Sequence, residues 1–255
     1  MTEQNIRRQK QFKILLIGDK CVDEYQYGVV DRISPEAPVP VFKPTYTESR
    51  PGMADNVKQN LEVLGLTVIS YFGDAGKKTR LVDSRSKQHI ARIDLEKVAS
   101  PVVLNKINYD EFDAIVVSDY NKGSVSYELI ETIIKDFSGP VFVDSKKQDL
   151  SRFNGAIVKI NENEYKARLS INDNLIVTLG NRGAVWKQDT NERLFNAQSV
   201  EVADVCGAGD TFLSALVFEY LHTGRIPEAI EFAIRASAIT VQHIGVYAPS
   251  LEEIK

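Results

Sequence analysis

The chain has 255 residues but few of the side chains that build metal clusters or redox motifs. Its two cysteines, Cys21 and Cys206, lie far apart in the sequence and form no CxxC pair. Its three histidines, His89, His222 and His243, show no metal-ligand spacing. This usage indicates neither a metal cluster nor a redox motif, and a reducing cytoplasm is the simplest setting.

The sequence also lacks long hydrophobic runs and a positive net charge. The apolar run Ile14–Ile17 is too short for the hydrophobic region of a signal peptide, although the basic stretch Arg7–Lys10 precedes it. We expect no export signal, no membrane span and no internal repeat. A net charge of −4 argues against a nucleic-acid-binding surface, so we expect no nucleic-acid partner.

With 43% hydrophobic and 26% charged residues, the composition is that of an ordinary globular protein. The length suits one large α/β domain or two small ones. We expect a single domain over residues 1–255 with an attached flap.

One stretch, Asp204–Phe212, reads D-V-C-G-A-G-D-T-F and is followed by apolar residues at helical spacing. We interpret Gly207, Ala208 and Gly209 as an anion-binding loop that opens a buried helix, because a helix start has unpaired N–H groups and partial positive charge. Asp210 is then a candidate general base, which phosphoryl transfer to an alcohol requires. The alternative is that Asp210 only favours a helix N-terminus and the glycines only form a tight turn.

The motif Asp204–Asp210 resembles the D-x-x-G-A-G-D signature of the PfkB, or ribokinase-like, carbohydrate kinases. Further motifs along Lys13–Ser250 narrow the likeness to the heptose 7-phosphate kinases, the kinase half of a bifunctional enzyme that makes activated heptose for lipopolysaccharide. The resemblance implies a ribokinase-like α/β fold, with a mostly parallel central sheet flanked by helices and a small β-strand lid. It also implies ATP and Mg²⁺ as cofactors, a small phosphosugar as substrate, and Asp210 as the base beside an anion hole of Gly207–Asp210 amides.

Asp19 and Asp23 follow the predicted buried strand 12–18, at the strand end where open α/β sheets bind ligands. They resemble the family's G-D-x-x-x-D motif, in which the second acid contacts the sugar. The alternative is a pair of solvated acids in a turn.

Residues 25–45 combine β-forming side chains with several prolines, which predicts edge strands or a projecting flap because proline cannot donate to a sheet. The run R-I-S-P-E-A-P-V-P-V at Arg32–Val41 is close to its counterpart in the heptose kinases, where it belongs to a lid that pairs subunits. We therefore expect lid strands over about 22–46 and 78–95, which would shield the transferring group from water. We also expect a homodimer formed through this lid.

The run Arg50–Val57, R-P-G-M-A-D-N-V, resembles the family's R-P-G-G-A-A-N-V and predicts a helix to about residue 64. The resemblance implies that Gly52 and Asn56 hold the sugar; alternatively, Asn56 is only a polar group at a helix start. Met53 and Asp55 depart from the motif. They place lid motion and sugar identity in question, because Met53 restricts the backbone and Asp55 adds a carboxylate.

Two intervals are shorter than in the family. The K-T-R at Lys78–Arg80 follows the predicted strand 66–72 almost at once, where the family has a further helix and strand. Arg80 is a candidate for binding the sugar's phosphate, and the alternative is an exposed charge on a strand. The second short interval lies between Glu164 and the predicted strand 174–178.

The remaining motifs also follow predicted strands. S-D-Y-N-K-G resembles the family's S-D-Y-G-K-G and implies that Asp119 and Lys122 hold the sugar, while Lys146 of V-D-S-K is a candidate point charge for phosphate. N-x-x-E, at Asn161 and Glu164, implies Mg²⁺ and nucleotide binding, or alternatively a helix N-cap. T-x-G-x-x-G implies an ATP site, or alternatively only a strand and a turn; its residues are Thr178, Gly180 and Gly183.

These motifs in family order predict an ATP-dependent sugar kinase that phosphorylates the anomeric hydroxyl of a heptose 7-phosphate. Helices over 209–223 and 226–244 and a closing nucleotide loop complete the prediction, and we expect no adenylyltransferase half. One rival is a kinase for another phosphosugar or a nucleoside, and another is a sugar-phosphate-binding protein that has lost turnover. An NAD-dependent oxidoreductase is disfavoured because no G-x-G-x-x-G follows the first strand.

Overall fold

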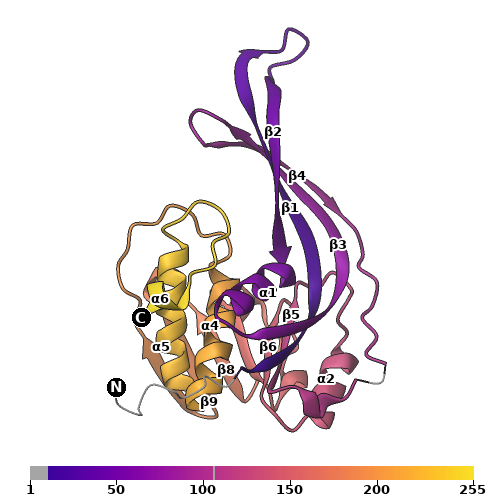
Figure 1. The fold of residues 1–255 in the computed structure, drawn as a ribbon, viewed down its shortest axis with the longest axis vertical. Helices are drawn as coiled ribbons and strands as arrows, with labels where there is room; N and C mark the ends of the chain where they lie inside the picture. Colours follow the sequence, from indigo (N-terminus) through magenta and orange to yellow (C-terminus); the bar gives the residue numbers. More distant parts are fainter. Residues whose placement is uncertain (1–10, 106) are drawn as a thin grey trace, which may run out of the picture.

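Ten strands join one sheet in the computed structural model, which describes residues 11–105 and 107–255 (Figure 1). The basic stretch Arg7–Lys10 lies outside the described residues. The order across the sheet is β10-β9-β8-β7-β6-β5-β1-β3-β4, and β2 pairs with β1 beside this path. The strands are β1 (Lys13–Ile33), β2 (Pro40–Met53), β3 (Thr67–Asp83), β4 (His89–Glu96), β5 (Ala114–Asp119), β6 (Val141–Ser145), β7 (Ile157–Asn161), β8 (Asn174–Thr178), β9 (Ala184–Gln188) and β10 (Asn191–Phe195).

The centre of the sheet is parallel from β8 to β3, while β2, β4, β9 and β10 are antiparallel. The expected α/β architecture with a mostly parallel central sheet is therefore confirmed. The helices are α1 (Ala54–Val63), α2 (Tyr127–Asp136), α3 (Glu162–Ala167), α4 (Ala208–Thr223), α5 (Ile226–Thr240) and α6 (Leu251–Ile254).

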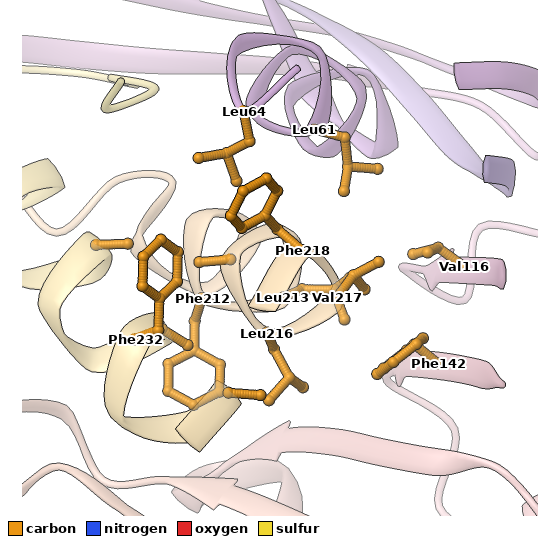
Figure 2. Close-up of a cluster of buried hydrophobic side chains, with 14 of the residues drawn as sticks. Leu61, Leu64, Val116, Phe142, Phe212, Leu213, Leu216, Val217, Phe218 and Phe232 are labelled. Carbon is orange, nitrogen blue, oxygen red and sulfur yellow. The ribbon is translucent and has the colours of Figure 1, made fainter. Parts of the chain in front are cut away.

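Both faces of the central strands are buried, and this explains their continuous apolar sequences. On β1, Ile14 and Leu16 pack in the core that contains α1, α4 and α5, whereas Leu15 and Ile17 pack in the core that contains α2. Figure 2 shows the first of these cores, in which side chains of α4 lie between α1, α5 and strands β5 and β6. Helix α4 is thus the central element of that layer.

The lid is made by the extensions of core strands. β1 pairs with β3 from Lys13↔Thr67 to Gly28↔Asp83, with one register shift between Lys20 and Val22, so both strands run from the central sheet into the lid. There they are joined by β2 and β4, and Figure 1 shows these four strands projecting away from the helices. The strand boundaries therefore differ from the predicted 22–46 and 78–95, because the pairing of β1 with β3 continues past the glycines and aspartates that mark a strand end in the sequence.

Both expected shortened intervals are visible. β3 is one continuous strand across the interval between Phe72 and Lys77, where we predicted that a helix and a strand are missing. Between β7 and β8, α3 has only six residues. The last predicted helix is shorter than expected, since α5 ends at Thr240 and the carbonyl of Val241 accepts the N–H groups of Ala203 and Asp204.

Met53 joins β2 to α1 in a strained backbone conformation. Its φ is 58° and its ψ is −133°, which glycine adopts easily and a residue with a Cβ does not. The side chain is nevertheless buried, against Cys21, Ala75 and Tyr120. The departure from the family's second glycine therefore stores strain at the junction of lid and helix.

We predict that Met53→Gly is more stable than Met53→Ala by about 1 kcal/mol, although alanine is ordinarily the better residue. Both variants lose the buried side chain, so their difference isolates the backbone strain. Urea unfolding followed by circular dichroism measures it. The control is Ala54→Gly, one residue into α1, which should show the ordinary loss of stability. A more stable Met53→Ala variant would show that Met53 is not strained.

Candidate active site

The carboxylate of Asp210 lies in the first turn of α4 and is held by two donors from other elements. Asn56 Nδ2, from α1, donates to Asp210 Oδ2 at 2.8 Å, and the hydroxyl of Tyr120, which follows β5, donates to Oδ1 at 2.8 Å. Asp210 itself is buried, with 7% of its surface exposed. Asp210 therefore does more than favour the N-terminus of α4, because both of these donors come from other elements.

Burial raises the pKa of Asp210 to about 6. The hydrogen bonds from Asn56 and Tyr120 oppose this effect because they stabilise the ionised carboxylate. Asp144 raises the pKa further and Lys159 lowers it. Asp210 consequently titrates close to neutral pH, as a group that takes up and releases protons must.

The loop before α4 presents backbone N–H groups at the helix start. Gly207 is the N-cap, with a φ of 78° and no side-chain cap. A Cβ on Gly207 would lie 3.0 Å from Asn56 Nδ2, and one on Gly209 would lie 3.0 Å from Lys159 Nζ. Asp204 fixes the loop, since its two oxygens accept the N–H groups of Cys206 and Gly245 at 3.0 and 2.9 Å. Anion binding by this loop stays a prediction.

A cavity of about 160 Å³, the smaller cavity, lies in front of Asp210. Lys146 Nζ lies 4.5 Å from the centre of the Tyr120 ring, and Lys159 Nζ forms a buried ion pair with Asp144 Oδ2 at 2.7 Å. Asp144 raises the pKa of Lys159 against the opposing effect of burial. The lining residues are Asp119, Tyr120, Asp144, Lys146, Lys159, Asn161, Glu164, Gly207, Gly209 and Asp210.

A larger cavity of about 610 Å³ adjoins the smaller one, because Gly209 lines both. The three T-x-G-x-x-G residues predicted to bind nucleotide gather here, together with Ala208 and apolar side chains of α4 and α5. The lining residues are Thr178, Gly180, Asn181, Gly183, Ala197, Gln198, Ser199, Val200, Val202, Val205, Ala208, Gly209, Phe212, Ile234, Ser237, Ala238 and Val241.

Asn161 and Glu164 form a capping box at the start of α3. Asn161 Oδ1 accepts the N–H of Glu164 at 2.9 Å, and Glu164 Oε2 accepts the N–H of Asn161 at 2.8 Å. The N-cap interpretation is thus confirmed, and metal binding by the same pair stays a prediction. Burial and the nearby Asp144 raise the pKa of Glu164. Within residues 11–105 and 107–255, no three His, Cys, Asp or Glu side chains converge on a possible metal site.

Asp19 and Asp119 are buried acids that hold neighbouring backbone in place. Asp19 accepts the N–H groups of Tyr120, Lys122 and Ser124 at 2.9 to 3.2 Å, and the Ser124 hydroxyl at 2.5 Å. The Asp119 carboxylate accepts hydrogen bonds from Ser145 Oγ at 2.6 Å, Lys147 Nζ at 2.8 Å and the N–H of Asn121 at 2.8 Å. Asp19 is fully buried, so the solvated-turn alternative is wrong for it, while sugar contact by either acid stays a prediction.

The other predicted substrate residues, apart from Asn56, lie at the base of the lid. Arg80 Nη1 pairs with Asp23 Oδ1 at 2.6 Å, and a Cβ on Gly52 would lie 2.6 Å from Asp23 Oδ2. The Arg80 side chain is only 11% exposed, so the alternative of an exposed strand charge is wrong. Lys122 Nζ pairs instead with Glu96 at the end of β4, at 2.7 Å.

Three residues of the site were not singled out from the sequence: Tyr120, Asp144 and Lys159. Lys159 carries a readable signal, because it interrupts the apolar strand I-V-K-I where a charge is costly unless it is paired. Tyr120 and Asp144 stand inside quoted motifs, but their contacts come from residues distant in the sequence.

Comparison with known proteins agrees with this geometry. Residues 149–254 match the model of the pfkB family of carbohydrate kinases. In structure, the chain is similar to ribokinase from Thermotoga maritima (TM-score 0.72, 17% identity, 95% of this chain and 98% of that one). Phosphofructokinase-2 from Escherichia coli is equally similar (TM-score 0.72, 17% identity, 96% and 97%). The fold is ribokinase-like, and residues 149–254 carry the match to the pfkB family of carbohydrate kinases.

Its curated relatives bear a more specific name. The bifunctional protein HldE of Hyphomonas neptunium is 33% identical over 95% of this chain, and that of Campylobacter jejuni is 32% identical over 97%. The chain spans 63% and 65% of the length of these relatives. The first alignment covers 308 positions, more than the 255 residues of this chain, so the relative has segments that this chain lacks.

No helix in the described part of the chain is long and apolar enough to cross a membrane.

We predict that Asp210→Asn gains stability relative to the wild type as the pH rises from 4 to 7. The pKa of Asp210 is raised from 3.8 to about 6, so the folded state holds its proton more tightly than the unfolded state, and ionisation costs folding free energy. This cost is absent below pH 3.8 and complete above about pH 6, where it reaches up to about 3 kcal/mol. Urea unfolding at each pH measures the difference, with Asp189→Asn as an exposed control. If the difference in unfolding free energy between Asp210→Asn and the wild type does not change with pH, the pKa of Asp210 is not raised by folding.

Proposed function

We propose that the protein transfers the γ-phosphoryl group of ATP to the anomeric hydroxyl of a heptose 7-phosphate. The observation that carries this proposal is the position of Asp210, which lines the smaller cavity directly after Gly209, the residue that lines both cavities. The name of the relatives supports a heptose as the acceptor.

The larger cavity has the size and lining to take the nucleoside of ATP, with Thr178, Gly180 and Gly183 at its edge. A ribokinase from Arabidopsis thaliana with the same fold was solved with ribose and ATP. Because Gly209 lines both cavities, the phosphate chain would pass this residue into the smaller one. The amides of Gly207–Asp210 would then stabilise the transferring group, with Lys146 and Lys159 as cations.

The donors of the smaller cavity fit Mg²⁺ carried by the nucleotide. Asn161 and Glu164 offer an amide and a carboxylate, and Mg²⁺ prefers a few protein oxygens together with phosphates and water. When bound, Mg²⁺ neutralises charge on the phosphates. Asn161 and Glu164 would hold it.

Asp210 acts as the general base. The acceptor hydroxyl gives its proton to the Asp210 carboxylate as its oxygen bonds to the γ-phosphorus and the bond from that phosphorus to the bridging oxygen of ADP breaks. Each carboxylate oxygen accepts one hydrogen bond, from Asn56 or Tyr120, and an oxygen of this kind can accept a second. The base thus remains able to receive the substrate hydroxyl.

The acceptor would lie between Asp210 and the lid base. Asp23, Gly52, Asn56, Asp119 and Lys122 would hold its hydroxyls, and Arg80 its phosphate. Met53 and Asp55 favour a second candidate, a kinase for another phosphosugar or a nucleoside, because they change the family's motif at this point. The retained base and anion loop speak against an inactive binding protein.

The first test is phosphorus NMR of the protein with Mg-ATP and D-glycero-D-manno-heptose 7-phosphate. We expect ADP and a new anomeric phosphate signal, with turnover lowered by about 10² to 10⁴ in Asp210→Asn and unchanged in Asp189→Asn. If other phosphosugars consume ATP and this heptose does not, the acceptor assignment fails and the kinase assignment survives. If nothing consumes ATP, the binding-protein candidate replaces it.

We also propose a homodimer formed through the lid, in the cytoplasm, where ATP is present and the free thiols of Cys21 and Cys206 stay reduced. The lid strands leave Val22, Ile93 and Leu95 between 44% and 60% exposed, which favours a protein contact there.

Light scattering should give the mass of a dimer for the wild type and of a monomer for the double variant Ile93→Lys, Leu95→Lys, because two charges would have to be buried at the contact. The control Leu169→Lys, Ile171→Lys adds the same charges at exposed positions away from the lid and should remain a dimer. A monomeric wild type would contradict the proposal.

A further inference from the structure

We propose that Tyr120 is the positioning residue of the base: its hydroxyl holds the Asp210 carboxylate ionised and oriented, and its ring orders Lys146 beside it. This inference rests on the proposed role of Asp210.

The backbone around Tyr120 is fixed on both sides. Asp19 accepts the N–H of Tyr120 at 2.9 Å, and Asn121 adopts a left-handed φ of 56°. These constraints direct the side chain toward α4, where its hydroxyl lies 2.8 Å from Asp210 Oδ1. Tyr120, in the turn after β5, therefore links Asp19 of β1 to the base Asp210: its backbone N–H donates to one acid and its hydroxyl donates to the other.

The ring serves a second contact. Lys146 Nζ lies 4.5 Å from the ring centre, within the range of a cation–π interaction. Both Lys146 and Tyr120 line the smaller cavity with Asp210. Tyr120 thus fixes the position of a phosphate-binding cation relative to the base, which sets the in-line geometry of phosphoryl transfer.

The hydroxyl is a donor at all working pH values, because burial and the nearby Asp210 raise the pKa of Tyr120 well above its usual range. A phenol that donates to a carboxylate favours the ionised over the protonated form. The other groups that act on Asp210 are Asn56 from α1, Asp144 from β6, Lys159 from β7 and Cys21 from β1. Tyr120 and Asn56 donate directly, and each takes a different carboxylate oxygen.

The test is Tyr120→Phe, which removes one oxygen and keeps the ring. Loss of a hydrogen bond to an ionised group should raise the pKa of Asp210 by about 1 to 2 pH units. The acid limb of kcat/KM should move up by the same amount, so activity falls near pH 6.5 and recovers near pH 9. A residue that only supports the fold would lower activity at every pH without moving this limb.

A second readout does not need turnover. Carbon NMR of protein labelled at the aspartate carboxyl carbons, with Asp210→Asn to assign the signal, gives the pKa of Asp210 directly in the wild type and in Tyr120→Phe. Replacement of Tyr120 by 3-fluorotyrosine, a stronger donor, should lower this pKa. The control Tyr127→Phe removes a hydroxyl that accepts the N–H of Asp149 at 3.0 Å and should leave it unchanged.

The outcomes separate this inference from the proposed function. An Asp210 pKa that moves in neither variant overturns the inference, whatever the turnover. A pKa that moves while the acid limb does not shows that Tyr120 has no positioning role in the reaction. If the wild type phosphorylates no sugar, the proposed function fails, and so does the inference that depends on it. The inference is supported if Tyr120→Phe raises both the pKa of Asp210 and the acid limb of kcat/KM, and 3-fluorotyrosine at position 120 lowers both.

Discussion

The burial of a carboxylate at the start of α4 is the constraint on which the site depends. Every residue from Asp210 to Phe218 is buried, so α4 cannot shift without disturbing the helices and strands around it (Figure 2). Burial disfavours the charged form of Asp210, and donors from two separate elements, Asn56 and Tyr120, offset part of that effect. The base thus requires α1, the turn after β5 and α4 to be assembled together.

The lid is continuous with strands of the central sheet. β1 and β3 pass from the central sheet into the lid, and their register shifts between Lys20 and Val22, at the junction. Such an irregularity bends a strand and increases its twist, which gives the lid a place to flex without a loop. Close to it, Gly52 packs on Asp23 and Met53 holds its strained conformation. We expect a lid of this construction to move by bending strands, because the glycine pair that the family motif has at this point is absent.

Much of the site could be predicted because its motifs are local. An acid or a glycine after an apolar run marks a strand end, and the strand ends of a parallel sheet share one edge. Asn161 and Thr178, at the ends of β7 and β8, line the two cavities, and ligand binding by them stays a prediction. The partners could not be predicted, because they are distant in sequence. Asp19 is bound by residues 120–124, and Lys159 by Asp144. The strand ends of the lid were missed because Gly18 and Asp19 in β1 and residues 73–76 in β3 resemble strand ends in the sequence, whereas the β1–β3 pairing continues past them.

The buried pair of Lys159 and Asp144 is costly for stability alone, since two apolar side chains of similar volume would fit strand interiors at least as well. Its effect on the base offers a physical reason for its presence. Asp144 raises the pKa of Asp210 and Lys159 lowers it, so the two effects oppose each other while the pair is intact. In the proposed reaction, phosphate oxygens in the smaller cavity would share the Lys159 cation with Asp144. The raising effect of Asp144 on Asp210 would then be less compensated, and the base would become stronger when the nucleotide is in place.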